Sequence, residues 1–316
     1  MKKLLAVILA VMMMLSLAAC SKPVVEEEPV NVAREPAAPA PTSIIVGNTT
    51  ISAEFLAFET PLIYDSSDEP DMDVLGNTVY VSNGSEIKVY TLDGSALAFD
   101  KTLEAEAGDN ISVDGSDKIY MDGGVFEAKI LDPATGASGN AVASGELTAS
   151  KNADFALTYF PGRENLTAIT GGAAAPWTLN GATNTGSFES ISNIEINGDT
   201  VLLAGADANN NIIAAYDISG NQQMMSSGCL AGSLPDACVK TANGYISSSV
   251  NEMTFVNADG SIIGEVDAKE LFGIENDSLW IYEMSPAADG SVLVLAQLYK
   301  SGVDGDELVL FKVSGF

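Results

Sequence analysis

Short runs in which apolar and polar residues alternate dominate the chain, and they recur about every 40 residues. Alternation with a period of two is typical of a β-strand that buries one face. In each repeat a short gap separates two such strands, and the second strand is followed by a turn that ends in Gly. Six segments carry this pattern, at residues 79–94, 119–136, 155–172, 201–220, 245–260 and 292–315.

Further short strands flank these pairs. Segments 111–118, 194–200 and 239–244 precede a pair, and 261–266 follows one. The Asp-Gly and Asn-Gly turns between them supply the positive φ angles that tight hairpins require. Four antiparallel strands in about 40 residues match one blade of a propeller. The pattern therefore predicts an all-β chain folded as a β-propeller.

The number of blades depends on how the ring closes. The sixth repeat stops at Phe316 after its third strand, while the strand-like segment 44–58 has no partner in any repeat. We therefore expect six four-stranded blades, with the N-terminal strand closing the last one. A seventh, degenerate blade within 44–75 or 173–192 is the main alternative. A β-sandwich would also contain many short strands, but it predicts no such period.

These repeats resemble the propeller domains of bacterial lipoproteins of the NHL-like or WD-repeat-like kind. The resemblance covers residues 72–316 and rests on the blade pattern, as in IYMDGGVFEAKILDPATG at 119–136. The Trp-Asp and Gly-His pairs of WD repeats do not occur in the sequence. The resemblance implies the architecture and carries no catalytic motif.

The first residues have the pattern of a secretion signal. Two lysines precede an apolar run that is short for a spanning helix, and the run ends in Leu17, Ala18, Ala19 and Cys20. This tetrad resembles the lipobox of bacterial lipoproteins. Residues 1–19 are thus predicted to be a lipoprotein signal peptide and Cys20 the lipidated first residue of the mature protein. An uncleaved transmembrane anchor is the alternative.

A linker is predicted to follow the lipidated cysteine. Residues 20–43 are rich in Pro, Glu and Ala and have no periodic apolar face, so the propeller domain is expected at 44–316. A Pro-rich segment of this length would hold the domain up to roughly 70 Å from the bilayer. We expect a location on the extracytoplasmic face of the cell envelope. Ser21 favours the outer membrane if the host has two.

Charge restricts the partners. With 14 basic and 43 acidic residues, the chain has a formal net charge of −29. Such a surface repels phosphate backbones, so nucleic acid is excluded as a partner. The expected partners are the membrane, through the lipid anchor, and a protein or glycan ligand.

Two cysteines remain once Cys20 is acylated. Cys229 and Cys238 lie in one Gly- and Pro-containing stretch, and an extracytoplasmic location favours a disulfide between them. Free thiols are the alternative. A redox-active pair is disfavoured because eight residues separate the cysteines.

The chain contains no histidine. This excludes Ser-His-Asp triads and Cys-His pairs, so an enzyme of this sequence would have to work with carboxylates. Paired carboxylates suit a glycosidase, yet no spacing singles out two of the acidic residues.

Calcium is the one ion that the composition favours, through oxygen ligands such as Asp207, Asp304 and Asp306. None of these segments matches an EF-hand loop, and solvated turns are the simpler interpretation. A calcium ion on the propeller axis, held by one carboxylate from each of several blades, is a further option. No other cofactor is expected.

Two residues are candidate ligand contacts. Trp177 follows a Gly/Ala-rich stretch and suits an exposed aromatic platform, although it can equally fold back onto its blade. Arg163, in a strand-to-strand turn, is one of the few cations of an anionic chain. Trp280 lies in an alternating strand, where packing in the core or between blades is favoured.

The first hypothesis for function is a membrane-anchored binding or scaffold protein that recognises a protein, peptide or glycan through its loops. A carboxylate-dependent hydrolase, similar to a glycosidase or lactonase, is the alternative. A third is a subunit of an envelope assembly or sensor complex.

Overall fold

The computed structural model describes residues 40–60, 62–64, 69–83, 86–103, 110–122, 127–160, 166–179, 188–230, 234–275, 278–299 and 306–316. The predicted signal peptide, the lipobox with Cys20, nearly all of the linker, Arg163 and Asp304 lie outside these residues. Across the part of the chain that is described, no helix has both the length and the apolar content needed to cross a bilayer.

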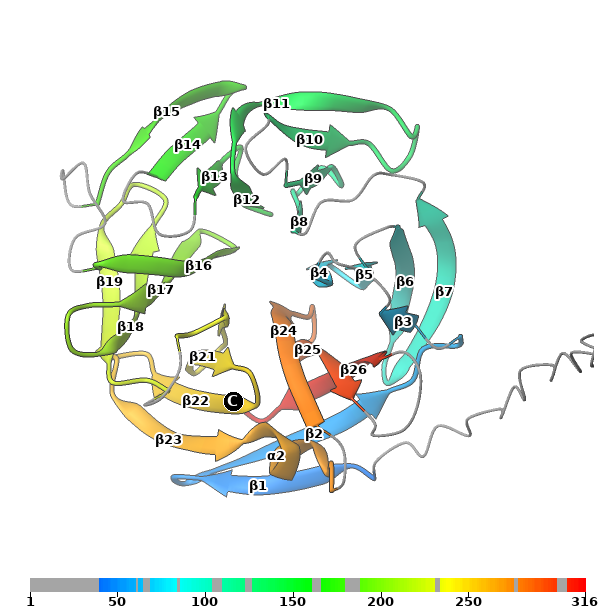
Figure 1. Ribbon diagram of the computed structural model, residues 1–316, viewed down its shortest axis with the longest axis vertical. Helices are drawn as coiled ribbons and strands as arrows, with labels where there is room; N and C mark the ends of the chain where they lie inside the picture. The colour runs from blue at the N-terminus through cyan, green and yellow to red at the C-terminus, as the bar shows by residue number, and fades with distance from the viewer. Residues whose placement is uncertain are drawn as a thin grey trace, which may run out of the picture. The chain divides into compact units, whose positions relative to one another are not determined.

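Six antiparallel sheets are arranged in a ring, as the alternating repeats predict (Figure 1). Five of them contain four strands each, in chain order from the axis to the rim. Blade 1 consists of β4 (Asp71–Leu75), β5 (Thr78–Ser82), β6 (Ile87–Asp93) and β7 (Ala96–Leu103), and blade 2 of β8 (Ile111–Val113), β9 (Ile119–Met121), β10 (Glu127–Leu131) and β11 (Ser138–Ser144). Blade 3 consists of β12 (Glu146–Ala149), β13 (Ala156–Tyr159), β14 (Leu166–Thr170) and β15 (Ala173–Trp177), and blade 4 of β16 (Ser190–Asn197), β17 (Thr200–Ala206), β18 (Asn211–Asp217) and β19 (Gln222–Ser227). Blade 5 consists of β20 (Ala237–Lys240), β21 (Gly244–Ser249), β22 (Glu252–Asn257) and β23 (Ile262–Asp267).

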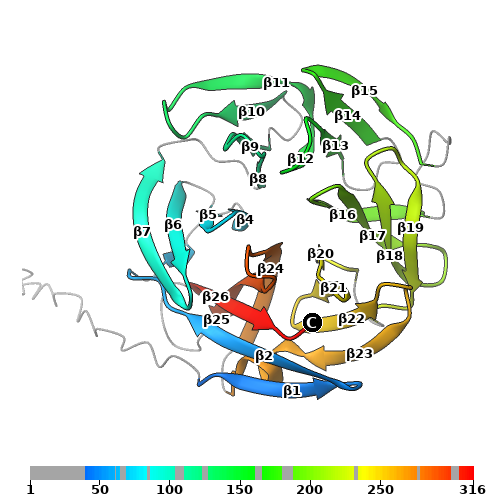
Figure 2. The same cartoon turned by 180° about the vertical axis from the view of Figure 1, so that it is seen from behind.

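Blade 6 joins the two ends of the domain. It contains β24 (Ser278–Pro286), β25 (Val292–Tyr299) and β26 (Asp306–Ser314), and β2 (Thr49–Leu56) pairs antiparallel with β26. The predicted closure by the N-terminal strand is confirmed. The chain also adds β1 (Thr42–Val46) as a fifth strand at the rim, next to β2 (Figure 2). β3 (Leu62–Tyr64) pairs with β26.

The rival seventh blade is ruled out. Segment 44–75 supplies strands to blades 6 and 1, and segment 173–192 contains β15 and the start of β16. The structure therefore has six blades.

The core lies between neighbouring sheets. Among the described residues, six clusters of buried apolar side chains each join two adjacent blades. Between blades 3 and 4, Trp177 packs against Phe155 and Tyr216, with ring centroids 6.3 and 6.2 Å apart. Between blades 5 and 6, the short helix α2 (Ala268–Phe272) stacks Phe272 on Phe311 at 4.1 Å.

The inner strand of each blade has one free edge, and side chains of the preceding blade bond to several of these edges. The N–H of Ile111 on β8 donates to Asp71 Oδ2 (2.5 Å), and that of Val113 donates to Asp73 Oδ2 (2.7 Å). Neutral side chains do the same further round the ring, where Ala149, Ile196 and Lys240 donate to Ser112 Oγ, Thr148 Oγ1 and Asn197 Oδ1. Since an unpaired buried N–H is costly, these bonds stabilise the ring.

Candidate functional site

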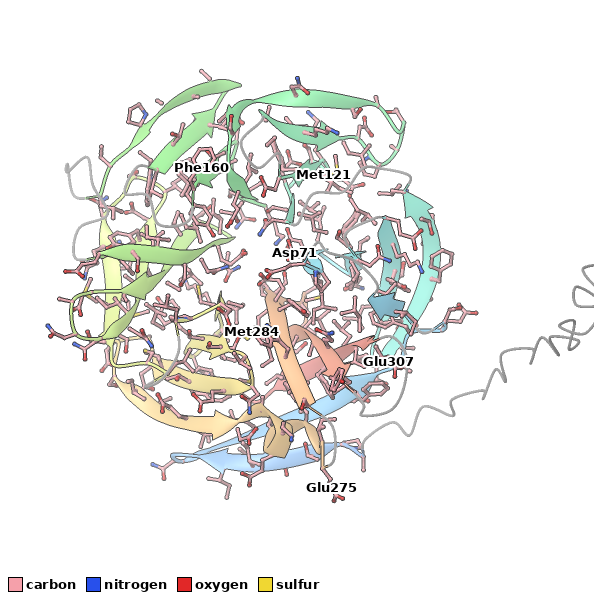
Figure 3. The ribbon with its side chains drawn as sticks, in the orientation of Figure 1. Asp71, Met121, Phe160, Glu275, Met284 and Glu307 are labelled. Carbon is pink, nitrogen blue, oxygen red and sulfur yellow. The ribbon has the colours of Figure 1, made fainter. Side chains whose placement is uncertain are left out.

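The inner ends of the blades enclose a cavity of about 240 Å³, which we call the axial cavity. All six blades, or the loops next to their inner strands, contribute to its wall. Figure 3 shows Asp71 near the centre of the ring. Six of the lining residues are acidic: Glu69, Asp71, Asp122, Glu146, Asp236 and Glu283. The axis is therefore the place where this anionic chain concentrates carboxylates.

Several of these carboxyl groups are withdrawn from water. Asp71 is 5% exposed and Glu283 4%. Burial, reinforced by the charges of Asp73 and Glu146, raises the pKa of Asp71 to about 8, although the N–H groups of Ile111 and Met72 act in the opposite direction. Asp71 therefore stays largely protonated at neutral pH.

Glu195 and Glu283 interact through the same cluster. Burial first, and then the charges of the other acidic residues, raise the pKa of both well above the ordinary value. Each carboxylate therefore makes its neighbours harder to ionise.

Lys151 supplies a positive charge beside this cluster. Its Nζ donates to Asp73 Oδ1 at 2.6 Å, and the Oγ of Ser285 donates to the same oxygen at 3.1 Å. Because Asp73 also bonds to β8, it connects blades 1, 2, 3 and 6. Asp73 is consequently a structural hub next to the cavity.

An aromatic pair stands beside the carboxylates. Trp280 and Tyr282 line the axial cavity with ring centroids 6.4 Å apart, and Trp280 is 47% exposed. The expectation that Trp280 packs in the core is wrong. On β24, the side chains of Leu279 and Ile281 are buried and Trp280 points the other way. Alternation predicted the strand but not which of its faces is buried.

Trp177 is not an exposed platform. It is 8% exposed, and its Nε1 donates to the Ile218 carbonyl at 2.9 Å. Trp177 instead folds back onto its blade, which was the alternative interpretation.

Of the three aspartates considered for calcium, Asp304 lies outside the described residues, and the other two belong to different blades. Asp207 lies in the turn between β17 and β18, where its Oδ1 accepts the N–H groups of Asn209 (2.8 Å) and Asn210 (2.7 Å). Asp306 begins β26 in another blade, and its side chain is outside the described set. Within the described residues, no three acidic or cysteine side chains are arranged to hold a metal ion.

The predicted disulfide is absent, and both cysteines are free thiols. Cys229 follows the outer strand β19 and Cys238 lies in the inner strand β20. The thiols donate to different acceptors, Ser226 Oγ (3.4 Å) and Asn193 Oδ1 (3.5 Å). Burial raises the pKa of both, which argues against redox chemistry.

Comparisons with known proteins support the architecture. No family model and no curated protein matches the chain. The structure is similar to one of a nidogen/laminin complex, with a TM-score of 0.52 and 8% identity over 68% of this chain and 86% of that one. It is also similar to the WD40 propeller of Doa1 (0.48, 10%, 81% and 97%) and to regucalcin, a calcium-binding protein of Agrobacterium tumefaciens (0.49, 14%, 82% and 94%). At these identities the likeness concerns the fold alone. The order of its own sheets shows that the chain is a six-bladed β-propeller.

Proposed function

We propose that this protein is a lipid-anchored, extracytoplasmic binding protein whose axial cavity receives a cationic group of its ligand. The observation that carries the proposal is the convergence of six acidic residues from different parts of the ring on one cavity. A cleft lined by one sign of charge focuses its field and attracts the opposite sign. The acidic composition of the whole chain extends this attraction beyond the cavity.

A bound cation would offset the free-energy cost of burying these carboxylates. Asp71 and Glu283, which line the cavity, have raised pKa values because they are buried near each other and near further carboxylates. An ammonium or guanidinium group between them replaces lost hydration with hydrogen bonds and favours their ionised forms. The exposed face of Trp280 adds a cation–π contact of about 0.5–2 kcal/mol.

The size of the cavity indicates which part of a ligand enters. A volume of about 240 Å³ lies below the roughly 300–1,000 Å³ of sites that enclose drug-sized molecules. It suits one side chain. A lysine or arginine of a peptide or protein therefore fits better than a free metal ion.

Peptide binding to the full-length protein in detergent tests this proposal. Acetyl-Gly-Lys-Gly-amide and its arginine counterpart are titrated by calorimetry, with the Nε-acetyl-lysine peptide as the neutral control. Glu283→Gln and Trp280→Ala should each weaken binding about tenfold or more. Asp207→Asn, which removes one charge from an exposed turn, should leave it unchanged. Equal binding of the neutral peptide, or equal effects of Glu283→Gln and Asp207→Asn, would refute the proposal.

The pH dependence gives a second check. Because binding favours ionised carboxylates, affinity should rise as the pH passes the Asp71 pKa of about 8. An affinity that stays flat between pH 6 and about 9 would contradict the role of Asp71.

A carboxylate-dependent hydrolase is the second candidate, favoured by the buried carboxyl group of Asp71, which lines the axial cavity and has a pKa raised to about 8. Such a group can act as a general acid, as in glycosidases. Release of nitrophenol from aryl glycosides, or opening of a lactone, that is lost in Glu283→Gln would support it. Lack of turnover with all of these substrates leaves binding as the function.

A further inference from the structure

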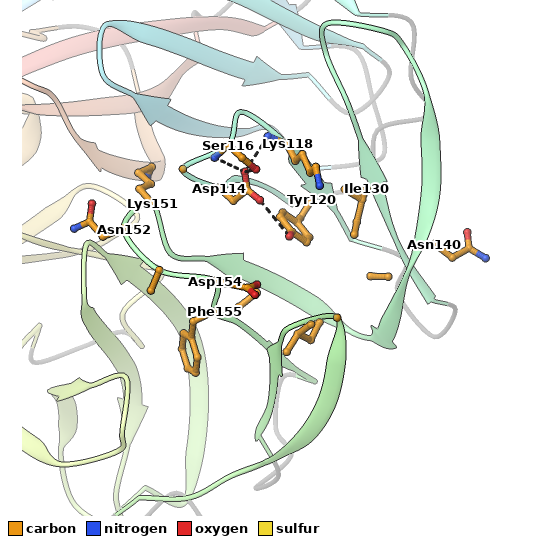
Figure 4. A pocket seen from close by; sticks show the side chains of 16 residues that line it. Asp114, Ser116, Lys118, Tyr120, Ile130, Asn140, Lys151, Asn152, Asp154 and Phe155 are labelled. Atoms are coloured by element: carbon orange, nitrogen blue, oxygen red, sulfur yellow. Dashed lines mark hydrogen bonds between the residues drawn. The ribbon is translucent and has the colours of Figure 1, made fainter.

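A second and larger cavity lies between blades 2 and 3, and we call it the inter-blade cleft (Figure 4). Its volume is about 650 Å³, within the range of small-molecule sites. Its lining residues and those of the axial cavity have no member in common. The cleft is therefore a separate feature of the ring.

Small side chains create the cleft. The cluster between blades 2 and 3 contains Ala128, Ala141, Ala149 and Ala156, where the contact between blades 3 and 4 contains large aromatic rings. Because the blades are held at their inner strands, small side chains further out leave space between the sheets. Ala141, Ala156 and Ile169 provide an apolar floor to that space.

Backbone contacts hold the two sides of the cleft in place. A Cβ atom on Gly115 would lie 2.1 Å from the carbonyl oxygen of Lys151, so only glycine allows the β8–β9 turn to approach blade 3 this closely. Asp114 fixes the same turn, since its Oδ1 accepts the N–H groups of Ser116 (2.8 Å) and Lys118 (3.0 Å). The site is formed before any ligand enters, which lowers the entropy cost of binding.

Few charged groups surround the cleft. Lys118, Asp114 and Asp154 line it, and Lys151, which also lines it, has its Nζ bound to Asp73. The remaining groups differ by one charge, so net charge gives little selection between ions and neutral ligands. The exposed amides of Asn140 and Asn152, one from each blade, add both donors and acceptors.

We propose that the inter-blade cleft binds a neutral carbohydrate, one or two sugar rings of a glycan. A sugar ring presents hydroxyl groups at its rim and apolar C–H groups on its faces. The hydroxyl groups match the mixed donors and acceptors at the edge of the cleft, and the C–H faces match its apolar floor. This binding is independent of the cationic ligand of the axial cavity.

The test is a calorimetric titration of the full-length protein in detergent with cellobiose, maltose and diacetylchitobiose at millimolar concentrations. Cellobiouronic acid and chitobiose, an anionic and a cationic disaccharide, serve as charged probes of similar shape. We expect at least one neutral disaccharide to bind and both charged sugars to bind at least tenfold more weakly.

Variants locate the binding. Asn140→Ala and Asn152→Ala alter exposed side chains and should each weaken binding at least fivefold, whereas Asn209→Ala, in an exposed turn of blade 4, should leave it unchanged. Ala156→Leu should abolish binding by filling the floor, with circular dichroism as the check on its fold. Trp280→Ala, which impairs the axial cavity, should have no effect.

Three results would overturn the proposal: no neutral disaccharide binds, a charged sugar binds as well or better, or Asn140→Ala and Asn152→Ala bind like Asn209→Ala. Loss of sugar binding in Trp280→Ala would instead assign the sugar to the axial cavity. If the cationic peptides do not bind to the axial cavity, the carbohydrate proposal is unaffected, because it is tested with other probes and other variants.

Discussion

Replacing Asp73 by Asn tests whether the axis is held together by its buried ion pair. Asn keeps an oxygen for the N–H of Val113 but removes the charge that faces Lys151. The Nζ–Oδ1 distance is 2.6 Å, and the two side chains are only 16% and 10% exposed. The lysine would thus be left with a charge that solvent compensates poorly.

The structure sets the size of the effect. Removing one partner of a buried pair costs about 3–5 kcal/mol, whereas an exposed pair contributes about 0–1 kcal/mol. Since both side chains retain some exposure, we expect Asp73→Asn to lower the free energy of unfolding by about 3 kcal/mol. Urea unfolding followed by circular dichroism measures this change.

Two further variants decide the cause. Glu86→Gln breaks the Lys88–Glu86 pair, which is 3.2 Å long but 21% and 36% exposed, and should cost less than about 1 kcal/mol. Lys151→Met introduced into Asp73→Asn should recover part of the loss, because it removes the uncompensated charge. If Asp73→Asn costs no more than Glu86→Gln, or if the double variant recovers nothing, the ion pair is not what stabilises the axis.

Three other results are expected. Asp71, with a folded pKa of about 8 against an ordinary 3.8, holds a proton that the unfolded chain releases, so stability should fall as the pH rises between these values. Urea unfolding across that range should show that the free energy of unfolding depends less on pH in Asp71→Asn. The same pH dependence in the variant would contradict the assigned role of Asp71. Cys20→Ala should move the protein from the membrane to the soluble fraction of fractionated cells, and persistence in the membrane would count against lipidation. Cys229 and Cys238 should react with iodoacetamide only after unfolding, and mass spectrometry of the native protein would reveal any earlier labelling.

The fold was predictable because one physical pattern recurs. Every blade needs short strands joined by tight turns, and those needs fix the spacing of the strands and the positions of the turn glycines locally. Closure by residues 44–58 followed from counting strands in the last repeat, and the pairing of β2 with β26 confirms it. The extra rim strand β1 was not predicted, because its sequence, TSIIV, has the same character as that of β2.

The axial cavity could not be read from the sequence, because its residues are far apart along the chain. Among them, Glu283 sits between Tyr282 and Met284 on the inner strand β24, and this position was the available signal. Identifying it requires knowing which strand of each repeat is innermost. The prediction of a disulfide between the two cysteines failed for a related reason. Their distance in the sequence does not show that one follows an outer strand and the other lies in an inner strand.

The acidic axis is more than the fold requires. Inner strand edges in this ring are satisfied by Ser112, Thr148 and Asn197 without any charge, so an aspartate at position 71 is not needed to accept a hydrogen bond from the next blade. Glu283 bonds to the N–H of its own neighbour, Met284, and so connects no blades through that bond. Burying these carboxyl groups near one another costs free energy, as their raised pKa values record. A feature that folding does not need and stability disfavours is best explained by what it binds, which is why Glu283→Gln should stabilise the ring while weakening its hold on a cationic ligand.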